Sequence, residues 1–261
     1  MATLQLDPAT LNAMRQLLQG KNRKWATPGD MAQHLDPDTI QTPALQLIDQ
    51  TLIDTTNTTD GRAIITLPPQ EGKSQRVSRR YPLWTLTHNP NTRIAIVSYS
   101  HAVARRWGRT IRDDITTHPD LGLTIRPDLS AQHEWQLAEA QGGVYTTGIG
   151  GSLTGRPVDL LIIDDPIKDR EQADSTIYRN RVWDWWTDVA STRLAPGAPV
   201  ILILTRWHQD DLAGRLLNAP DGHRWKLLNI PAQAETSNDP LGRKPGQLSL
   251  IHISEPTRRT P

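Results

Sequence analysis

Four short apolar runs stand out along an otherwise polar chain. They cover residues 62–67, 93–98, 159–163 and 199–204, and each is nearly continuous rather than alternating with polar positions. Runs of this length, rich in Ile, Val and Leu, are typical of strands buried on both faces of a parallel sheet. We therefore predict a buried, mainly parallel sheet.

Helical spacing of apolar residues separates these runs. It covers about residues 73–87, 101–116 and 175–192, and Pro82 is expected to kink or end the first of these helices. Strand and helix alternating along the chain predict a doubly wound α/β domain. In such a domain, ligands bind at the carboxyl ends of the strands.

The chain before the first strand has a different character. Residues 1–20 and 43–52 have the spacing of amphipathic helices, and a polar, proline-containing segment separates them. We expect a small helical N-terminal subdomain. Residues 118–142 give no clear pattern, and residues 232–247 are typical of a linker or loop.

Composition narrows the function classes. A chain of 261 residues has room for one sizeable core, and its net charge of +1 means that any contact with nucleic acid must come from local patches. The chain has no cysteine, which excludes disulfides, thiol catalysis and cysteine-based zinc sites. We find neither a signal peptide nor an apolar run of membrane-spanning length, and we expect a cytoplasmic protein without a membrane partner.

The first apolar run leads into a turn that ends in Gly72-Lys73-Ser74. A strand followed by such a turn and a helix is the arrangement of a P-loop. Its backbone N–H groups cradle phosphates, its lysine reaches the terminal phosphates, and its serine helps to hold Mg²⁺. Leu67 stands where the usual motif has its first glycine, so the turn alone also fits an ordinary loop.

A second candidate site is the pair of carboxylates after the run at 159–163. Asp164 and Asp165 follow it directly, and Pro166 comes next. A buried strand that ends in acids is the Walker B arrangement, and we assign Asp164 to Mg²⁺ and Asp165 to the attacking water. Plain turn chemistry is the alternative.

The last apolar run ends in Thr205 and Arg206. Thr205 is a candidate sensor of the γ-phosphate, and Arg206 a candidate contact to phosphate or DNA. His208, Asp210 and Asp211 follow, but no further ligand has suitable spacing, so a helix-capping and surface-polar role is favoured over a metal site.

Two further basic features are candidates for binding anions. A glycine-dense run at 148–156 ends in Arg156, which is a candidate charge stabiliser for the hydrolysed phosphate. The helix at 101–116 carries four arginines that fit either DNA phosphates or a solvated face: Arg105, Arg106, Arg109 and Arg112.

Taken in order, these motifs resemble the ATPase half of the large terminase subunit of tailed bacteriophages. The resemblance spans about residues 40–235 and rests on Pro68-Pro69-x-x-Gly72-Lys73-Ser74, Ser98-Tyr99-Ser100, Gly150-Gly151-Ser152-Leu153-Thr154-Gly155, Leu161-Ile162-Ile163-Asp164-Asp165-Pro166 and Thr205-Arg206-Trp207-His208.

The resemblance implies a P-loop NTPase that hydrolyses ATP with Mg²⁺ and drives double-stranded DNA through a portal into a procapsid. It implies contacts with the portal protein, the procapsid and the small terminase subunit, and a homo-oligomeric ring during packaging. The resemblance implies that the protein acts in the cytoplasm of the infected host or of a prophage-bearing cell. Thr205 would couple hydrolysis to movement. The nucleotide would contact Pro69, Gln70, Glu71, Gly72, Lys73 and Ser74.

Two departures from the family concern the active site. Many relatives carry an arginine in the loop, where this chain has Gln70 and Glu71. The stabilising charge must then come from Arg156, from the helix at 101–116 or from a neighbouring subunit. Many relatives also have Glu where this chain has the shorter Asp165.

We divide the chain into a helical segment at 1–55, an ATPase domain at 56–232 and a linker at 233–248. Residues 249–261 resemble translated sequencing-adapter DNA, with a divergent linker as the alternative. The family continues into a C-terminal nuclease domain of RNase H-like fold, and we expect that domain to be missing and no nuclease activity from this chain.

Two other functions stay open from the sequence. One is a helicase or another P-loop ATPase that depends on nucleic acid, although nothing after residue 215 resembles a second lobe. The other is a truncated protein that binds nucleotide without turnover.

Overall fold

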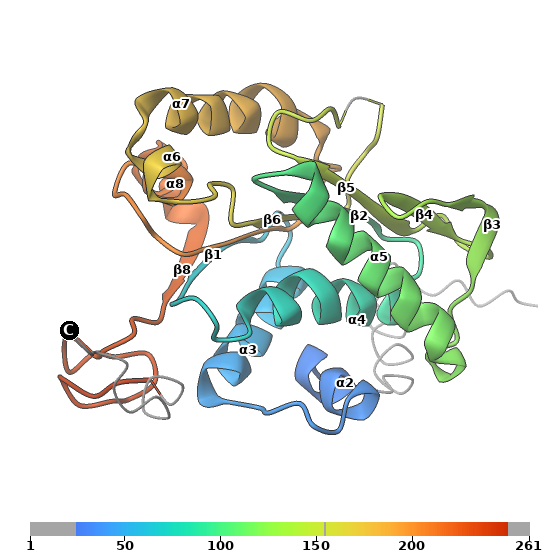
Figure 1. The fold of residues 1–261 in the computed structure, drawn as a ribbon, viewed down its shortest axis with the longest axis horizontal. Coiled ribbons are helices and arrows are strands. Elements are labelled where there is room, and N and C mark those ends of the chain that lie inside the picture. Colours follow the sequence, from blue (N-terminus) through green and yellow to red (C-terminus); the bar gives the residue numbers. More distant parts are fainter. Residues whose placement is uncertain (1–24, 154, 250–261) are drawn as a thin grey trace, which may run out of the picture.

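The computed structural model describes residues 25–153 and 155–249 and is built around one eight-stranded sheet (Figure 1). The strand order is β3-β4-β5-β2-β6-β7-β1-β8. Six strands, from β5 to β8 in this order, are parallel, whereas β3 and β4 form an antiparallel extension at one edge. Their bounds are β1 Arg62–Thr66, β2 Arg93–Ser98, β3 Ile125–Ser130, β4 Glu134–Leu137, β5 Gly143–Gly148, β6 Leu160–Asp164, β7 Val200–Leu204 and β8 Trp225–Asn229.

The four apolar runs of the sequence form the centre of this sheet. They correspond to β1, β2, β6 and β7, each within one residue of the predicted bounds. Every residue of β6 and β7 is buried, because helices cover both faces. The predicted mainly parallel α/β fold is confirmed.

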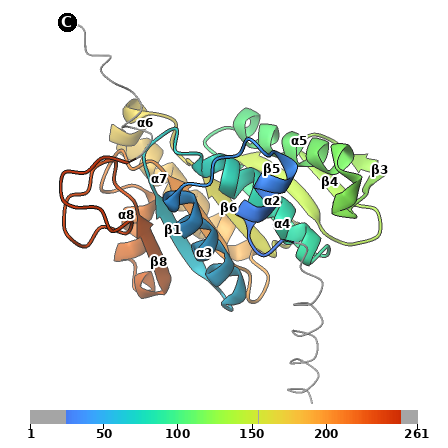
Figure 2. The same cartoon turned by 90° about the horizontal axis from the view of Figure 1, so that it is seen from below.

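One face of the sheet packs against helices from the N-terminal half of the chain (Figure 2). They are α2 (Pro28–Leu35), α3 (Pro43–Asn57), a π-helix (Gln75–Arg80) that runs into α4 (Tyr81–His88), and α5 (His101–Thr117). Their buried residues meet Ile65, Ile96 and Ile162 of the strands in one cluster. Burial of apolar surface on this scale is the main stabilising term of the fold.

Helices from the second half of the chain cover the opposite face. They are α6 (Arg170–Asp174), α7 (Thr176–Asp184), a π-helix (Trp185–Ala190) with a 3₁₀ turn (Ser191–Arg193), and α8 (Leu212–Asn218). Trp185 and Trp186 pack with Val97 and Ile163 in a second cluster. Adjacent residues of one strand, such as Ile162 and Ile163, therefore pack into the clusters on opposite faces of the sheet, because successive side chains of a strand point to opposite faces.

Three helical expectations differ from the structure. The first predicted helix was expected to kink or end at Pro82; it does not end there but changes from a π-helical turn to α4, of which Pro82 is the second residue. Proline fits there because the first residues of an α-helix need no N–H partner. The helix predicted at 43–52 continues to Asn57. The polar segment before it contains α2, whose start is fixed by a capping box between Thr27 and Asp30.

Four strands were not predicted from the sequence: β3, β4, β5 and β8. β5 contains two threonines between glycines, and β8 is an edge strand with exposed positions. Neither has a continuous apolar run, so pairing with β2 and β1 decides their conformation.

The segment at 232–247 has neither helix nor strand, as predicted, but it is held in place. Arg243 forms an ion pair with Asp239 and donates to the carbonyl oxygen of Pro231. The helix expected at 1–20 and residues 250–261 of the adapter-like segment lie outside the described residues. None of the helices in the described ranges is long and apolar enough to cross a membrane.

Candidate active site

The glycine-containing loop after β1 turns through two left-handed residues. Gln70 has a φ of 68° and Gly72 a φ of 77°. Backbone that alternates between left- and right-handed residues forms concave nests of N–H groups that bind anions. The π-helix starts at Gln75, so the loop also precedes a helical N-terminus. Glu71 is buried and its carboxylate accepts a hydrogen bond from Ser249.

Asp164 ends β6 and is held by hydroxyl groups from the helix that follows the loop. Its Oδ1 accepts a hydrogen bond of 2.9 Å from Ser74, and its Oδ2 accepts one of 2.8 Å from Ser78. Burial, and then the charge of Asp165, raise the pKa of the Asp164 carboxyl to about 6, against the opposing effect of the two serines and Lys73. Asp164 is 2% exposed, so its charge is largely removed from water.

Lys73 links the loop after β1 to the carboxyl ends of β6 and β7. Its Nζ donates to Thr205 Oγ1 at 2.9 Å and lies 3.2 Å from Asp165 Oδ2. The backbone N–H of Thr205 donates to Asp165 Oδ1 at 2.8 Å. Asp165 has a φ of 44°, a left-handed conformation that is uncommon outside glycine and clusters at functional sites.

The structure thus brings five of the predicted residues to one edge of the sheet: Lys73, Ser74, Asp164, Asp165 and Thr205. This happens because β6, β7 and β1 are neighbours and parallel, so their carboxyl ends meet.

The oxygen donors at this edge fit Mg²⁺. Ser74 offers a hydroxyl and Asp164 a carboxylate, which are the hard ligands that this ion prefers. The described residues contain no group of three or more His, Cys, Asp or Glu side chains that would form a metal site by itself. An ion here would complete its shell with nucleotide phosphates and water, as Mg²⁺ does in many phosphoryl-transfer enzymes.

Arg156 has its contacts elsewhere. Its guanidinium donates to Glu134 of β4 at 3.0 and 3.1 Å and lies 4.4 Å from the ring centre of Tyr145. The hydrogen bonds with Glu134 raise its pKa. Its role as a charge stabiliser stays a prediction, and it requires the side chain to leave Glu134.

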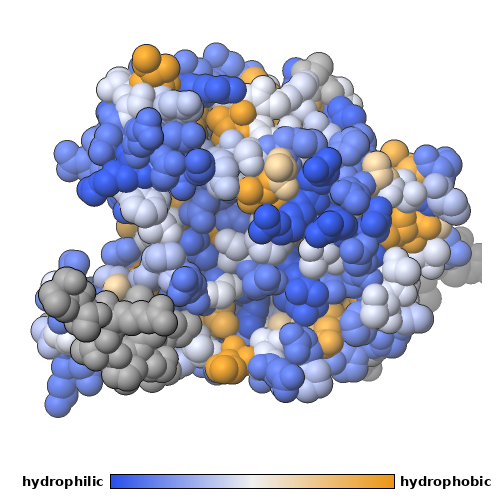
Figure 3. All heavy atoms as spheres, in the orientation of Figure 1, coloured by the Kyte–Doolittle hydropathy of each residue, from blue (hydrophilic) through white to orange (hydrophobic). Residues whose placement is uncertain are grey.

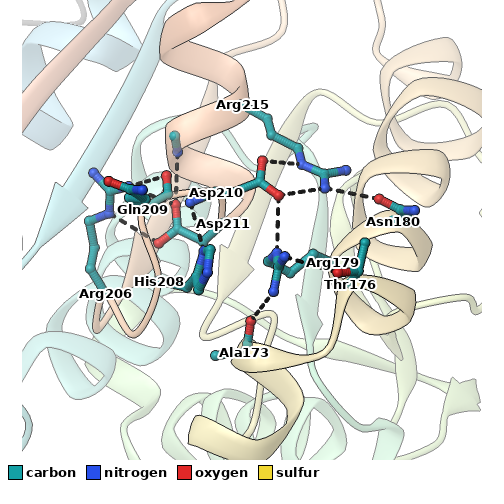
Figure 4. A network of polar contacts seen from close by, with 11 residues as sticks. Ala173, Thr176, Arg179, Asn180, Arg206, His208, Gln209, Asp210, Asp211 and Arg215 are labelled. Atoms are coloured by element: carbon teal, nitrogen blue, oxygen red, sulfur yellow. Dashed lines mark hydrogen bonds and ion pairs between the residues drawn. The ribbon is translucent and has the colours of Figure 1, made fainter.

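The segment after Thr205 forms a polar network with α7 and α8 (Figure 4). Asp210 accepts hydrogen bonds from Arg179 and Arg215, which hold its pKa well below the ordinary value. Asp211 caps α8 by accepting from the N–H of Gly214 at 2.8 Å and also pairs with Arg206. The Asp211 cap and the partly exposed ion pairs of Asp210 agree with the helix-capping and surface-polar role expected for this segment.

Sequence reasoning missed one member of the site, Ser78. Its signal was the spacing of four residues from Ser74, which places two hydroxyls on the same side of a helix.

The comparison with protein families decides the relationship. The model of the family "Terminase large subunit, T4likevirus-type, N-terminal" matches residues 64–250. The chain belongs to this family.

Solved terminase structures share the fold. The crystal structure of the HK97 bacteriophage large terminase is 15% identical with a TM-score of 0.50, and the match covers 77% of this chain. The large terminase ATPase domain of Thermus phage P74-26 is 12% identical with a TM-score of 0.50, covering 80% of this chain and 87% of that one. This chain spans only 41% of the HK97 protein. None of the curated proteins compared with the chain matches it.

These findings confirm the predicted resemblance and the P-loop α/β fold. At such identities the structural likeness extends to the fold alone, so roles for individual residues rest on the geometry described above.

Proposed function

We propose that this terminase chain is an ATP-hydrolysing motor domain that drives double-stranded phage DNA into a procapsid. The observation that carries the proposal is the contact of Lys73 with both Asp165 and Thr205 beside the Ser74–Asp164 pair. A cation, two acids and two hydroxyls at one sheet edge after a phosphate-binding loop are the parts that phosphoryl transfer needs.

Lys73 has a different partner in each state of the proposed cycle. In the structure its ammonium is buried and pairs with Asp165. Bound phosphates attract the same ammonium, because they carry more negative charge than one carboxylate. Asp165 is then released to accept a proton from water, and the Thr205 hydroxyl is released to contact the γ-phosphate.

Mg²⁺, held by Ser74 and Asp164, would neutralise charge on the phosphates. Asp165 would orient the attacking water and Thr205 would report loss of the γ-phosphate to the network around Asp210. As in other phosphoryl transfers, the residues of the chain act by positioning and charge stabilisation.

ATP turnover by the full chain tests this proposal. We expect Lys73→Ala to lower turnover at least about a hundredfold, because one electrostatic contact to the transition state is worth this much. Lys226→Ala is the matched control, since Lys226 lies on β8 beside Ala63 at the other end of β1 and pairs only with Asp54 among the described carboxylates. Equal rates for Lys73→Ala and the wild type would contradict the assignment.

For DNA, we propose contact through the exposed side of α5. Arg105, Arg106 and Arg109 are exposed and form no ion pair with the described residues, and Figure 3 shows strongly hydrophilic side chains over this helix. Three free guanidinium groups on about one and a half helical turns suit the spacing of duplex phosphates.

The salt dependence of DNA binding tests this surface. We expect log K to fall with log salt, and Arg105→Ala/Arg109→Ala to reduce the slope by roughly 2, because each phosphate contact contributes about 0.9. Arg126→Ala is the control, because this exposed arginine is already paired with Asp128. An unchanged slope for the double variant would exclude α5 as the contact surface.

The portal protein, the small terminase subunit and assembly into a ring are proposed as partners because of family membership. A neighbouring subunit in such a ring is also the proposed source of a catalytic arginine if Arg156 does not supply it.

A further inference from the structure

Ser78 is buried in the π-helix that follows the phosphate-binding loop. Its side chain is 0% exposed, and its hydroxyl donates to Asp164 Oδ2 at 2.8 Å. Ser74, four residues earlier, donates to the other oxygen of the same carboxylate at 2.9 Å. Each oxygen of the Asp164 carboxylate therefore accepts a hydrogen bond from one serine. The two hydrogen bonds together prevent the carboxylate from rotating about its Cβ–Cγ bond.

We propose that Ser78 is a positioning residue that fixes the Asp164 carboxylate in the orientation that Mg²⁺ requires. The inference rests on the proposed function, in which Ser74 and Asp164 hold the metal. Ser74 has two tasks there, because its oxygen binds the ion while its proton faces Asp164. Ser78 has one task, and it acts through Asp164 rather than on the nucleotide.

The helix that carries Ser78 is anchored at the next two positions. Arg79 donates to both oxygens of Asp114 on α5 at 2.7 and 2.8 Å, and Arg80 donates to one of them at 3.2 Å. The turn is π-helical, and the N–H of Tyr81 bonds to the carbonyl of Arg76 five residues back. Short π-helical segments occur often at functional sites. Ser78 is thus followed directly by two residues that are tied to α5, which is the kind of support that a metal ligand needs.

A purely structural hydrogen bond is the competing explanation, and Ser98 provides a matched control for it. Ser98 lies on β2 directly beside Asp164 in the parallel register and is 1% exposed. Its hydroxyl has no hydrogen-bond partner among the described residues. Replacing either serine by alanine removes one buried oxygen near the same strand end, but of the two only Ser78 donates a hydrogen bond to the carboxylate.

The test is the Mg²⁺ dependence of nucleotide binding by the full chain, measured with a fluorescent ADP analogue. We expect Ser78→Ala to raise the Mg²⁺ concentration at half-maximal binding roughly tenfold, because lost outer-sphere partners typically cost 10–100-fold in metal affinity. We expect the Mg²⁺ concentration at half-maximal binding to stay within about twofold of the wild-type value in Ser98→Ala. We expect Ser78→Thr, which keeps the hydroxyl, to have the wild-type value as well. Thermal unfolding without Mg²⁺ checks that each variant is folded.

The outcomes separate the two proposals. If the wild type shows no Mg²⁺-dependent nucleotide binding, both this inference and the proposed function are wrong. If the wild type binds and Ser78→Ala has the same Mg²⁺ dependence, only the role of Ser78 is wrong. An equal loss in Ser78→Ala and Ser98→Ala also overturns it. If Ser78→Ala does not fold, Ser78→Cys takes its place, because a thiol is a weak hydrogen-bond donor and predicts the same direction of change.

Discussion

The substitution Asp164→Asn is expected to stabilise the nucleotide-free protein while removing its proposed metal site. The Asp164 carboxylate is ionised at neutral pH although it is 2% exposed and lies beside Asp165. An asparagine of the same shape carries no charge. The hydroxyls of Ser74 and Ser78 can rotate, so one can accept from the amide while the other still donates to its oxygen.

The magnitude follows from the pKa of Asp164, which burial and the neighbouring charge raise from 3.8 to about 6. Each pH unit corresponds to about 1.4 kcal/mol, so ionised Asp164 lowers the free energy of unfolding by about 3 kcal/mol at pH 7.5. The folded state binds its proton more tightly than the unfolded state. The destabilisation by Asp164 therefore becomes smaller as the pH falls from about 6 towards 3.8. At pH 5 it is about half of its value at pH 7.5.

Urea unfolding with EDTA at pH 7.5 and pH 5 measures this effect. We expect the free energy of unfolding of Asp164→Asn to exceed that of the wild type by about 1–3 kcal/mol at pH 7.5, and this difference to shrink at pH 5. Asp159→Asn is the control with the opposite sign. Burial opposes ionisation of Asp159, which directly precedes the same strand, but hydrogen bonds from Arg93 outweigh burial and lower the pKa of Asp159. If Asp164→Asn is less stable than the wild type at pH 7.5, with no dependence on pH, the reasoning is refuted.

Three further substitutions test the packing, the loop and the network around Asp210. Ile162→Ala removes a fully buried side chain from the middle of β6, and we expect urea unfolding to show a loss of about 2–5 kcal/mol; a loss below about 1 kcal/mol would contradict the burial. Gly72 has a φ of 77°, so Gly72→Ala should cost about 1–2 kcal/mol in thermal unfolding, and an unchanged transition would mean that the loop adopts another conformation. Asp210→Ala removes the partner of Arg179 and Arg215, and because the pair is partly exposed we expect a loss of about 1 kcal/mol at pH 7. The pKa of Asp210 is lowered, so the difference from the wild type should vanish as the pH falls well below 3.8, and a difference that persists there would exclude the ion pairs as its cause.

Most of the candidate site was predictable from sequence because its chemistry lies at strand ends. A strand followed by Gly72-Lys73-Ser74, and another followed by Asp164 and Asp165, indicate both the residue types and their edge of the sheet. The partners of these groups were not predictable. That Lys73 reaches Thr205 depends on β7 lying next to β6 and β1, an order that does not follow the sequence.

Arg156 illustrates the opposite case. Its position after a glycine-dense run suggested an anion-binding role, but Glu134 is available 3.0 Å away on a strand that the sequence pattern did not reveal. Local pattern cannot assign the partner of a charged side chain, because that partner comes from a distant segment.

By itself, the sequence determined the buried core of the sheet, the helices that alternate with it and the family. Continuous apolar runs form buried strands in nearly any context, because leaving them in water costs far more than local preferences can offset. The tertiary structure decided what those preferences left open: the polar strands β3, β4, β5 and β8, the π-helix before Pro82, and the hydrogen bond from Ser78 to Asp164. Each of these depends on a neighbour supplied by the assembled sheet, because pairing, burial and hydrogen-bond partners exist only once distant segments are packed together.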